Sequence, residues 1–340
     1  MKEALVSKGP TVQIIESPMP EPNGDQVLIK VVVSGSNPKD WKVPEYHGIT
    51  TNSGDDIAGI VTKVGFNVTE FKPGDRVAAL HEVFKPHGSY AEYAIAWAYT
   101  TFHIPKETTF EEAAAIPLTA MTAALSLYQR LGLPQPWQPA QEPMPLIIYG
   151  AASAVGAYAV QLAKQSNIHP LITVAGRALD YVESLIDRTK GDTIIDYRAG
   201  DDAVVEGLKK ALGNNPAMYA LDAVSDNGSY VNIGKVLGHG AKITFVLPGK
   251  EYPGIPENVE QTVTSVGIVH EDNLASQNFA FVYFRLFGRG LQEGWLKPQR
   301  QEIVPGGLAG IQPALDKLKA GKASGVKYVF RISDTEGIEK

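Results

Sequence analysis

The sequence predicts an α/β protein with two domains, one a doubly wound parallel sheet and the other rich in short β-strands. Two observations carry this prediction. Strands and helices alternate regularly between residues 146 and 247, whereas glycine and proline punctuate short strand-like runs up to about residue 105. With 340 residues, of which 44% are hydrophobic, the chain can form two substantial cores.

The alternating region reads as a parallel sheet covered by helices on both faces. Asp201, Asp202 and Asp226 are expected to cap two of these helices. The predicted strands cover 146–149, 171–174, 193–196, 217–223 and 241–247, and the predicted helices cover 155–166, 178–189, 201–212 and 228–237. We assign residues 126–265 to this domain.

The β-rich domain is predicted to comprise residues 1–125 and to be completed by residues 266–340. A proline-dense connector at 134–145 is expected to be an ordered loop, because proline lacks an N–H and restricts φ. The expected strands are 26–34, 57–64, 76–79, 262–269 and 326–332, and the expected helices are 111–116, 119–131, 277–292 and 310–320.

The most informative segment joins the apolar run Leu146–Tyr149 to a helix through a turn of small residues. The turn reads Gly150-x-x-Ser153-x-x-Gly156. Small residues let the backbone approach a pyrophosphate, and the helix N-terminus presents N–H groups and a positive dipole end to it. The pattern departs from G-x-G-x-x-G, so an ordinary strand-to-helix turn remains an alternative at this point.

The end of the next strand bears on the choice of dinucleotide. It reads Ala175-Gly176-Arg177, and no carboxylate follows before Asp180. A carboxylate there would bind the ribose 2′-hydroxyl of NAD, whereas an arginine can pair with a 2′-phosphate. The sequence therefore favours NADPH, the alternative being a solvated surface arginine.

Composition excludes several classes of function. The net charge of −6 and the absence of a lysine or arginine run argue against a nucleic-acid surface. There is no cysteine, the seven histidines show no H-x-x-x-H spacing, and no metal site is expected. No secretory signal is visible, and no apolar stretch approaches the ~18 residues of a membrane span. We expect a soluble, cytoplasmic protein that binds neither nucleic acid nor membrane.

Residues 54–77 resemble the signature of the medium-chain dehydrogenase/reductase superfamily. Their skeleton is G-x-D-x-x-G-x-V-x-x-V-G followed by V-x-x-F-x-x-G-D-R-V, and Gly88–Tyr93 resembles the next block of that family. With the turn at 150–156, the resemblance spans essentially the whole chain. It implies a GroES-like first domain and a Rossmann-type second domain.

The chain departs from the zinc alcohol dehydrogenases of that superfamily. The loop that would supply a cysteine ligand reads Ser36–Lys42, and Gly-His-Glu is replaced by Gly54-Asp55-Asp56. Without these ligands we expect no Lewis-acid metal to polarise an alcohol or carbonyl, and we read Asp55-Asp56 as a structural turn. The classes of this superfamily that remain as candidates are the zinc-free reductases that act on polarised C=C bonds or on quinones.

Finer motifs resemble the fungal trans-acting enoyl reductases, which work beside polyketide synthases. They are Asn37-Pro38-x-Asp40-x-Lys42, the entry Leu131-Gly-Leu-Pro-x-Pro136, Tyr149-Gly150-x-x-Ser153, and Asp196-Tyr197-Arg198. The resemblance implies hydride transfer from NADPH to the β-carbon of an α,β-unsaturated thioester, in secondary metabolism. The alternatives are an NADPH-dependent quinone or small-enone reductase, and a non-catalytic NADPH-binding protein.

The resemblance also implies a site in the cleft between the domains. The residues that it assigns to the cofactor are Lys39, Asp40, Trp41, Lys42, Gly150, Ala152, Ser153, Ala154, Val155, Gly156, Ala175, Gly176, Arg177, Ala178, Tyr197, Val246, Leu247 and Lys327. Those that it assigns to the substrate are Thr122, Gly267, Ile268, Val269 and His270.

Lys42 and Thr122 are the predicted catalytic residues, because an enolate needs a donor aimed at its oxygen. Lys42 could instead be a solvated loop lysine, and Thr122 could bond its own helix backbone. Tyr46 and His270 are weaker candidates for the proton donor, and solvent could serve instead. The chain could be a monomer, or a homodimer in which the strand 262–269 extends a sheet across a two-fold axis.

Overall fold

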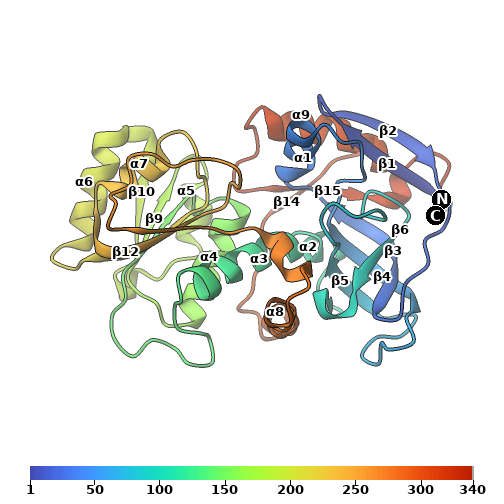
Figure 1. Ribbon diagram of the computed structural model, residues 1–340, viewed down its shortest axis with the longest axis horizontal. Helices are drawn as coiled ribbons and strands as arrows, with labels where there is room; N and C mark the ends of the chain where they lie inside the picture. The colour runs from blue at the N-terminus through green and yellow to red at the C-terminus, as the bar shows by residue number, and fades with distance from the viewer. Residues whose placement is uncertain (339–340) are drawn as a thin grey trace. The chain divides into compact units, whose positions relative to one another are not determined.

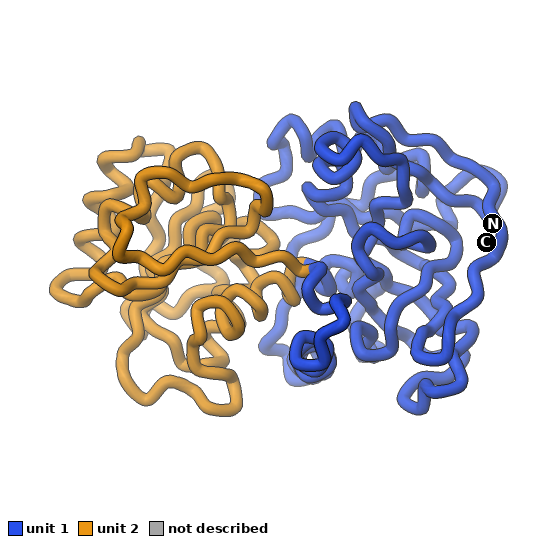
Figure 2. The backbone as a smooth tube through the Cα atoms, viewed as in Figure 1, with its two compact units in different colours: residues 1–118, 267–340 blue, residues 119–266 orange. Residues whose placement is uncertain are grey.

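The computed structural model describes residues 1–338, and the chain forms two compact units (Figure 2). The first unit contains residues 1–118 together with residues 267–340, and the second contains residues 119–266. The chain therefore leaves the first unit once and returns to it once. No helix among residues 1–338 is both long enough and apolar enough to cross a bilayer.

The second unit is built on a six-stranded parallel sheet (Figure 1). The strand order is β10-β9-β8-β11-β12-β13, so the winding direction reverses between β8 and β11, as in doubly wound folds. The strands are β8 (Leu146–Tyr149), β9 (Leu171–Ala175), β10 (Thr193–Asp196), β11 (Ala217–Asp222), β12 (Leu237–Phe245) and β13 (Glu260–Val263). The predicted Rossmann-type sheet is confirmed.

The helices of this sheet are α4 (Ala154–Gln165), α5 (Leu179–Glu183), α6 (Asp201–Leu212) and α7 (Ser229–Gly234). α6 buries Val204, Leu208 and Leu212, which recur every four residues and so share one face. The predicted helix 178–189 is wrong beyond Glu183. The expected aspartate caps are also wrong, because Gly200 and Gly228 occupy the N-cap positions.

The segment before β8 departs from the single predicted helix 119–131. α3 (Pro117–Ala124) continues into a π-helix, Leu125–Arg130, in which the Leu131 N–H reaches the Ser126 carbonyl at 3.0 Å. A π-turn inserts one extra residue into a helix and often marks a functional site. In this protein the π-helix begins directly after the last turn of α3, which contains Thr122.

The first unit contains a seven-stranded sheet in which strands from the two ends of the sequence meet. β15 (Lys327–Arg331) pairs antiparallel with β3 (Gln26–Gly35), and β14 (Gln301–Ile303) pairs with β15. The remaining strands are β4 (Asp56–Val64), β5 (Arg76–Leu80), β6 (Tyr93–Trp97) and β7 (Thr101–His103). The prediction missed a separate hairpin of β1 (Lys2–Ser7) and β2 (Thr11–Glu16).

Several helices pack around this sheet. Ser36–Lys42, predicted as a loop, runs into α1 (Lys39–His47), which ends at Gly48 with a left-handed φ of 66°. α8 (Leu274–Glu293), capped by Asn273, packs against β7 and the 3₁₀-helix η1 (Ala98–Thr100). The other helices are α2 (Phe110–Ala113), η6 (Gly307–Gly310), α9 (Ile311–Lys319) and η7 (Ile332–Asp334).

The predicted strand 262–269 is wrong over most of its length. β13 ends at Val263, and Val266–His270 forms the 3₁₀-helix η5. Thr264 explains the break, because its Oγ1 bonds the buried hydroxyls of Ser126 at 3.1 Å and Thr244 at 2.9 Å. A residue held inward in this way cannot continue an exposed sheet edge.

A buried ion pair joins the ends of the first unit. The Lys327 Nζ on β15 donates to the Asp56 carboxylate on β4 at 2.5 Å and to Asn37 Oδ1 at 3.0 Å. Asn37 donates to the same carboxylate at 2.6 Å, and the Leu118 N–H donates to its other oxygen at 2.7 Å. The Lys327 and Asp56 side chains are 2% and 0% exposed, so both charges are removed from bulk solvent.

We expect Lys327→Met to lower the free energy of unfolding by about 3–5 kcal/mol, because Asp56 would remain buried without a counter-charge. Urea unfolding of both proteins measures this loss. Lys63→Met is the control, since Lys63 pairs with Glu21 while the two side chains are 55% and 68% exposed, and it should cost no more than about 1 kcal/mol. Equal losses for the two variants would contradict the prediction.

Candidate functional site

The turn between β8 and α4 has the geometry of an anion cradle. Gly150 has a φ of +80°, and a Cβ on Gly156 would lie 2.3 Å from the Gly150 carbonyl oxygen. Ser153 is the N-cap of α4, and its hydroxyl accepts from the Gly156 N–H at 3.1 Å. The first-turn N–H groups of Ala154 and Val155 point out of the helix end, where a pyrophosphate can accept from them.

This turn lies at the point where the sheet reverses direction. The neighbouring strand β11 ends in Asp222, whose side chain is fully buried and whose pKa is raised by that burial. Its carboxylate accepts from the N–H groups of Val224 at 3.0 Å and Ser225 at 2.8 Å, and from the Ser229 hydroxyl at 2.6 Å. These bonds hold the loop that follows β11 beside the glycine turn.

Ser225 then links this loop to the segment after β12. Its φ of 57° is left-handed, its hydroxyl donates to the Asp222 carbonyl at 2.7 Å, and it accepts from the Val246 N–H at 2.9 Å. The Leu247 carbonyl accepts from the Tyr252 hydroxyl at 2.6 Å. These two bonds use the Val246 N–H and the Leu247 carbonyl. They do not involve the Val246 carbonyl or the Leu247 N–H, which are therefore the groups that we consider for a ligand.

Sequence reasoning missed both Asp222 and Ser225. The signal that could have found them is a carboxylate that directly ends a buried strand and is followed by Ser225, Asp226 and Asn227. Short polar side chains of this kind bond nearby backbone N–H groups and so shape loops.

The ends of β9 and β10 meet at a second predicted subsite. A Cβ on Gly176 would lie 2.4 Å from the ring of Tyr197, so the ring rests directly on this glycine. Tyr197 is 44% exposed, and Arg177 is exposed beside it. The carboxylate that ends β10, Asp196, is paired with Arg198 at 2.6 Å, which offsets the negative charge that would repel a phosphate. Ala175 and Ala178 are buried on either side of this subsite.

In the first unit, the start of α1 carries a cluster of buried charges. The Lys39 Nζ contacts the Asp55 carboxylate, lies 3.2 Å from Asp40 and donates to the Ser53 carbonyl at 2.6 Å. Burial raises the pKa of Asp55, but Lys39 and the hydrogen bond from His81 outweigh this effect and leave the pKa lowered. Burial likewise lowers the pKa of Lys39, and the two carboxylates outweigh it and leave that pKa raised.

His81 closes one end of this cluster. Its Nδ1 lies 2.8 Å from Asp55 and its Nε2 lies 2.9 Å from the Pro86 carbonyl oxygen. Both partners can only accept, so both hydrogen bonds form together only when the ring carries two protons. Among residues 1–338 there is no group of three or more His, Cys, Asp or Glu side chains that could hold a metal ion.

Asp40 is fully buried at the other end of the cluster. Its carboxylate accepts from the Tyr90 hydroxyl and from the Asn37 N–H, both at 2.6 Å. Burial raises the pKa of Asp40 to about 6, since the opposing effect of Lys39 is smaller and Asp55 adds to the increase. The side chain thus makes its contacts inside the first unit.

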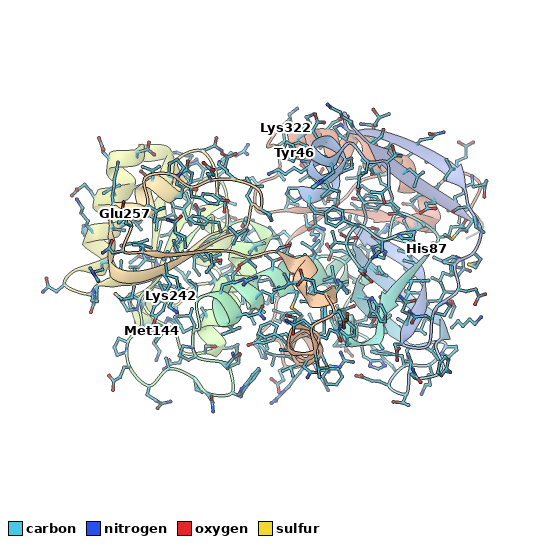
Figure 3. The ribbon with its side chains drawn as sticks, viewed as in Figure 1. Tyr46, His87, Met144, Lys242, Glu257 and Lys322 are labelled. Atoms are coloured by element: carbon cyan, nitrogen blue, oxygen red, sulfur yellow. The ribbon has the colours of Figure 1, made fainter. Side chains whose placement is uncertain are left out.

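Trp41 and Lys42 complete the first turn of α1. The Trp41 ring packs against the core of the first unit, and the Lys42 Nζ lies 5.7 Å from its centroid. Lys319 approaches the same ring at 5.4 Å. Tyr46, considered as a proton donor, is 70% exposed on α1, the helix that neighbours α9 (Figure 3). Lys327, the remaining predicted cofactor residue in this unit, is held in the pair with Asp56.

The predicted substrate residues are divided between the units. Thr122 is buried in α3 of the second unit, and its carbonyl accepts from the Ser126 hydroxyl at 2.8 Å. Gly267, Ile268, Val269 and His270 belong to η5 in the first unit, and Val269 is fully buried. His270 has no hydrogen-bond partner for either ring nitrogen among the described residues, and burial lowers its pKa to about 3.

We expect Asp40 to make stability fall as pH rises from about 4 to 6. In this window the native carboxyl, with its pKa near 6, keeps a proton that the unfolded chain has lost. The unfolding free energy of the wild type minus that of Asp40→Asn should therefore decrease by up to about 1.4 kcal/mol per pH unit. Urea unfolding at several pH values measures the difference.

Asp187→Asn is the control for this measurement. Hydrogen bonds from Thr189 lower the pKa of Asp187, so the unfolding free energy of the wild type minus that of Asp187→Asn should rise slightly up to about pH 5 and then stay flat, opposite to the fall expected for Asp40. A flat difference for Asp40→Asn would show that Asp40 is ionised in the native protein throughout this range.

Comparison with known proteins places these features in a family. Residues 23–106 match the family model of the alcohol dehydrogenase GroES-like domain. The trans-enoyl reductase fsr4 of Gibberella fujikuroi is 54% identical over 315 residues, which cover 91% of this chain and 92% of that protein. The trans-enoyl reductase ACTTS2 of Alternaria alternata is 30% identical over 94% of this chain and 96% of its own length.

Solved structures agree on the fold. A putative zinc-dependent alcohol dehydrogenase from Rhizobium etli superposes with a TM-score of 0.83 at 24% identity, over 97% of this chain and 98% of that one. The CurK enoyl reductase superposes with a TM-score of 0.77 at 19% identity, over 96% and 98%. The sequence relatives and the matched GroES-like domain show that the chain belongs to the trans-enoyl reductases of the medium-chain dehydrogenase/reductase superfamily.

Proposed function

We propose that this protein is an NADPH-dependent reductase that transfers hydride to the C=C bond of an enoyl thioester, in the cytoplasm and beside a polyketide synthase. The observation that carries the proposal is the Gly150–Gly156 turn at the reversal point of a parallel sheet, in a chain 54% identical to a trans-enoyl reductase. The turn fits a bound dinucleotide. The identity to a trans-enoyl reductase indicates that the reaction is the reduction of an activated alkene.

The residues of the second unit fit NADPH in three places. Gly150 and residues 152–156 would hold the pyrophosphate through backbone N–H groups. Arg177 would pair with the 2′-phosphate. Gly176 and Tyr197 would contact the adenosine, and Ala175 and Ala178 lie on either side of them. The free backbone groups of Val246 and Leu247 would meet the carboxamide.

When bound, NADPH supplies a hydride from its nicotinamide ring. The chain's own task is then to stabilise the negative charge that develops on the thioester oxygen. We assign this task to the Thr122 hydroxyl and the Lys42 ammonium group. Trp41 orients Lys42 through their contact, and Lys39, Asp40 and Lys327 act by holding the start of α1 in place. Gly267–His270 would line the substrate.

The function is tested by NADPH oxidation with purified protein and three substrate sets, namely trans-2-enoyl N-acetylcysteamine thioesters, simple quinones and primary alcohols. Turnover of the thioesters, and weaker turnover with NADH, supports the proposal. Turnover of quinones alone would identify a quinone reductase. NADPH binding without any turnover would identify a non-catalytic binding protein.

We expect Arg177→Ala to raise the KM for NADPH roughly tenfold, because a charge-assisted bond to the 2′-phosphate is lost. The KM for NADH should change less than twofold, since NADH lacks that phosphate. Arg188→Ala is a matched control, because Arg188 lies in the same unit and pairs with Glu183. Equal effects on both cofactors would refute the role of Arg177.

We expect Thr122→Val and Lys42→Met each to lower kcat by about 10²-fold with little change in the KM for NADPH, since each removes a donor to the transition state. Thr122→Ser should keep most of the activity. Thr119→Val, one turn earlier on α3 and also buried, is the control. A kcat for Thr122→Val that equals that of Thr119→Val would remove Thr122 from the proposed site.

A further inference from the structure

The first unit contains a cavity of about 410 Å³ whose lining residues, apart from His270, have no role in the proposed reaction. Its size falls within the range of small-molecule sites. All of its lining residues belong to this unit, and they come from the loop before β3, the segment between β4 and β5, β6 and η1, the end of η5, and α8. They are Asp25, Asn67, Val68, Thr69, Glu70, Trp97, Ala98, Tyr99, His270, Gln277, Phe281 and Arg285.

Aromatic side chains form much of its wall. The rings of Trp97 and Tyr99 stack with their centroids 5.9 Å apart. On α8, Phe281 keeps 45% of its surface exposed, which is high for a large apolar side chain. Val68 and Ala98 add aliphatic surface. The wall therefore favours a ligand with substantial apolar area.

The guanidinium of Arg285, which lines the cavity, is paired within the protein. Both ends of the Arg285 guanidinium contact the Glu70 carboxylate, and the same group donates to the Tyr99 carbonyl at 3.0 Å and the Ala98 carbonyl at 3.2 Å. Asp25 accepts from the Asn67 amide at 2.9 Å. With its cation already saturated, the cavity offers little to an anionic ligand such as a phosphate.

Two neutral hydrogen-bonding groups remain. The Tyr99 hydroxyl has no hydrogen-bond partner among residues 1–338, and burial raises the pKa of Tyr99 well above its ordinary value. The His270 ring lies 6.1 Å from the Tyr99 ring and is uncharged at neutral pH. These groups can bond neutral oxygens, such as hydroxyl or keto groups on a ligand.

The cavity is also close to the cluster at the start of α1. Trp97, which lines the cavity, donates its indole N–H to Glu82 at 2.7 Å, and the adjacent residue His81 lies 2.8 Å from Asp55 in that cluster. A ligand bound beside Lys39 and Lys42 could therefore extend along the cavity, past Tyr99 and Trp97.

We propose that this cavity binds the distal part of the substrate, a largely apolar acyl chain that carries neutral oxygens. This inference rests on the proposed function, because it states which length and polarity of the substrate's acyl chain the reductase prefers. A short enoyl group would not reach the cavity, whereas a long one would gain contacts in it.

Ala98→Phe tests the proposal by filling the cavity. We expect kcat/KM for the trans-2-dodecenoyl N-acetylcysteamine thioester to fall by about tenfold or more, the effect of losing two or three buried methylenes. For the trans-2-butenoyl thioester it should change less than twofold. Ala309→Phe is the matched control, because Ala309 also lies on a 3₁₀-helix of this unit but is exposed.

Tyr99→Phe tests the polar part. With an 11-hydroxy-2-dodecenoyl thioester we expect kcat/KM to fall about threefold or more, and with the plain dodecenoyl thioester no fall. Tyr93→Phe on β6 is its control, since Tyr93 does not line the cavity. Equal effects on short and long substrates, or no effect of Ala98→Phe on either, would overturn the proposal.

A binding measurement separates this inference from the proposed reaction. If the wild type reduces no thioester, the proposed function fails, and calorimetric titration with the saturated dodecanoyl thioester still tests the cavity. A Kd at least tenfold weaker for Ala98→Phe than for Ala309→Phe would support the assignment. Equal affinity would refute it.

Discussion

Charge neutrality inside the first unit is the constraint on which its architecture depends. Asp56 lies where β4, β15, the segment before α1 and the start of α3 converge, and each of them supplies or accepts a hydrogen bond there. A carboxylate without water must find such partners, so their positions are set by one another. Such a pair contributes more to positioning than to net stability, because its desolvation offsets much of its attraction.

The second cluster, around Lys39, extends the same constraint to the candidate site. Lys39 contacts Asp55 and lies 3.2 Å from Asp40, and His81 bonds Asp55, so the charge of Lys39 is matched by carboxylates beside the start of α1. Two lysines in the first turn of a helix are unfavourable next to its positive dipole end, and the carboxylates offset this.

Much of the second unit could be predicted from the sequence. Strands buried on both faces appear as short apolar runs, and 193–196 and 201–212 are correct to the residue. Capping was predicted poorly, because a glycine can begin a helix where the backbone adopts a positive φ, as it does at Gly200 and Gly228. The role of Asp222 was missed because most of its partners are backbone N–H groups of the loop that follows it, and a loop's conformation is not visible in the sequence.

The first unit was predicted less completely, for different reasons. Pro38 at the N-cap and Pro44 inside the helix make α1 look like a loop, because proline is tolerated at a helix start but disfavoured in a helix interior. The hairpin of β1 and β2 is short and half exposed, so its apolar periodicity is weak. The prediction of a strand over 262–269 was wrong because it rested on the apolar residues of this segment. The buried hydroxyl network around Thr264, which ends the strand, cannot be inferred from the sequence.

The insertion of one unit within the other has a consequence for the order of events during synthesis. Residues 119–266 are contiguous, so their parallel sheet can form while the ribosome is still translating the rest. The first unit, by contrast, needs β15, which pairs with β3 across almost 300 residues of sequence. Until β15 emerges, the edge of β3 and the carboxylate of Asp56 lack their partners, and the nascent amino-terminal half exposes an open sheet edge to chaperones and to other chains.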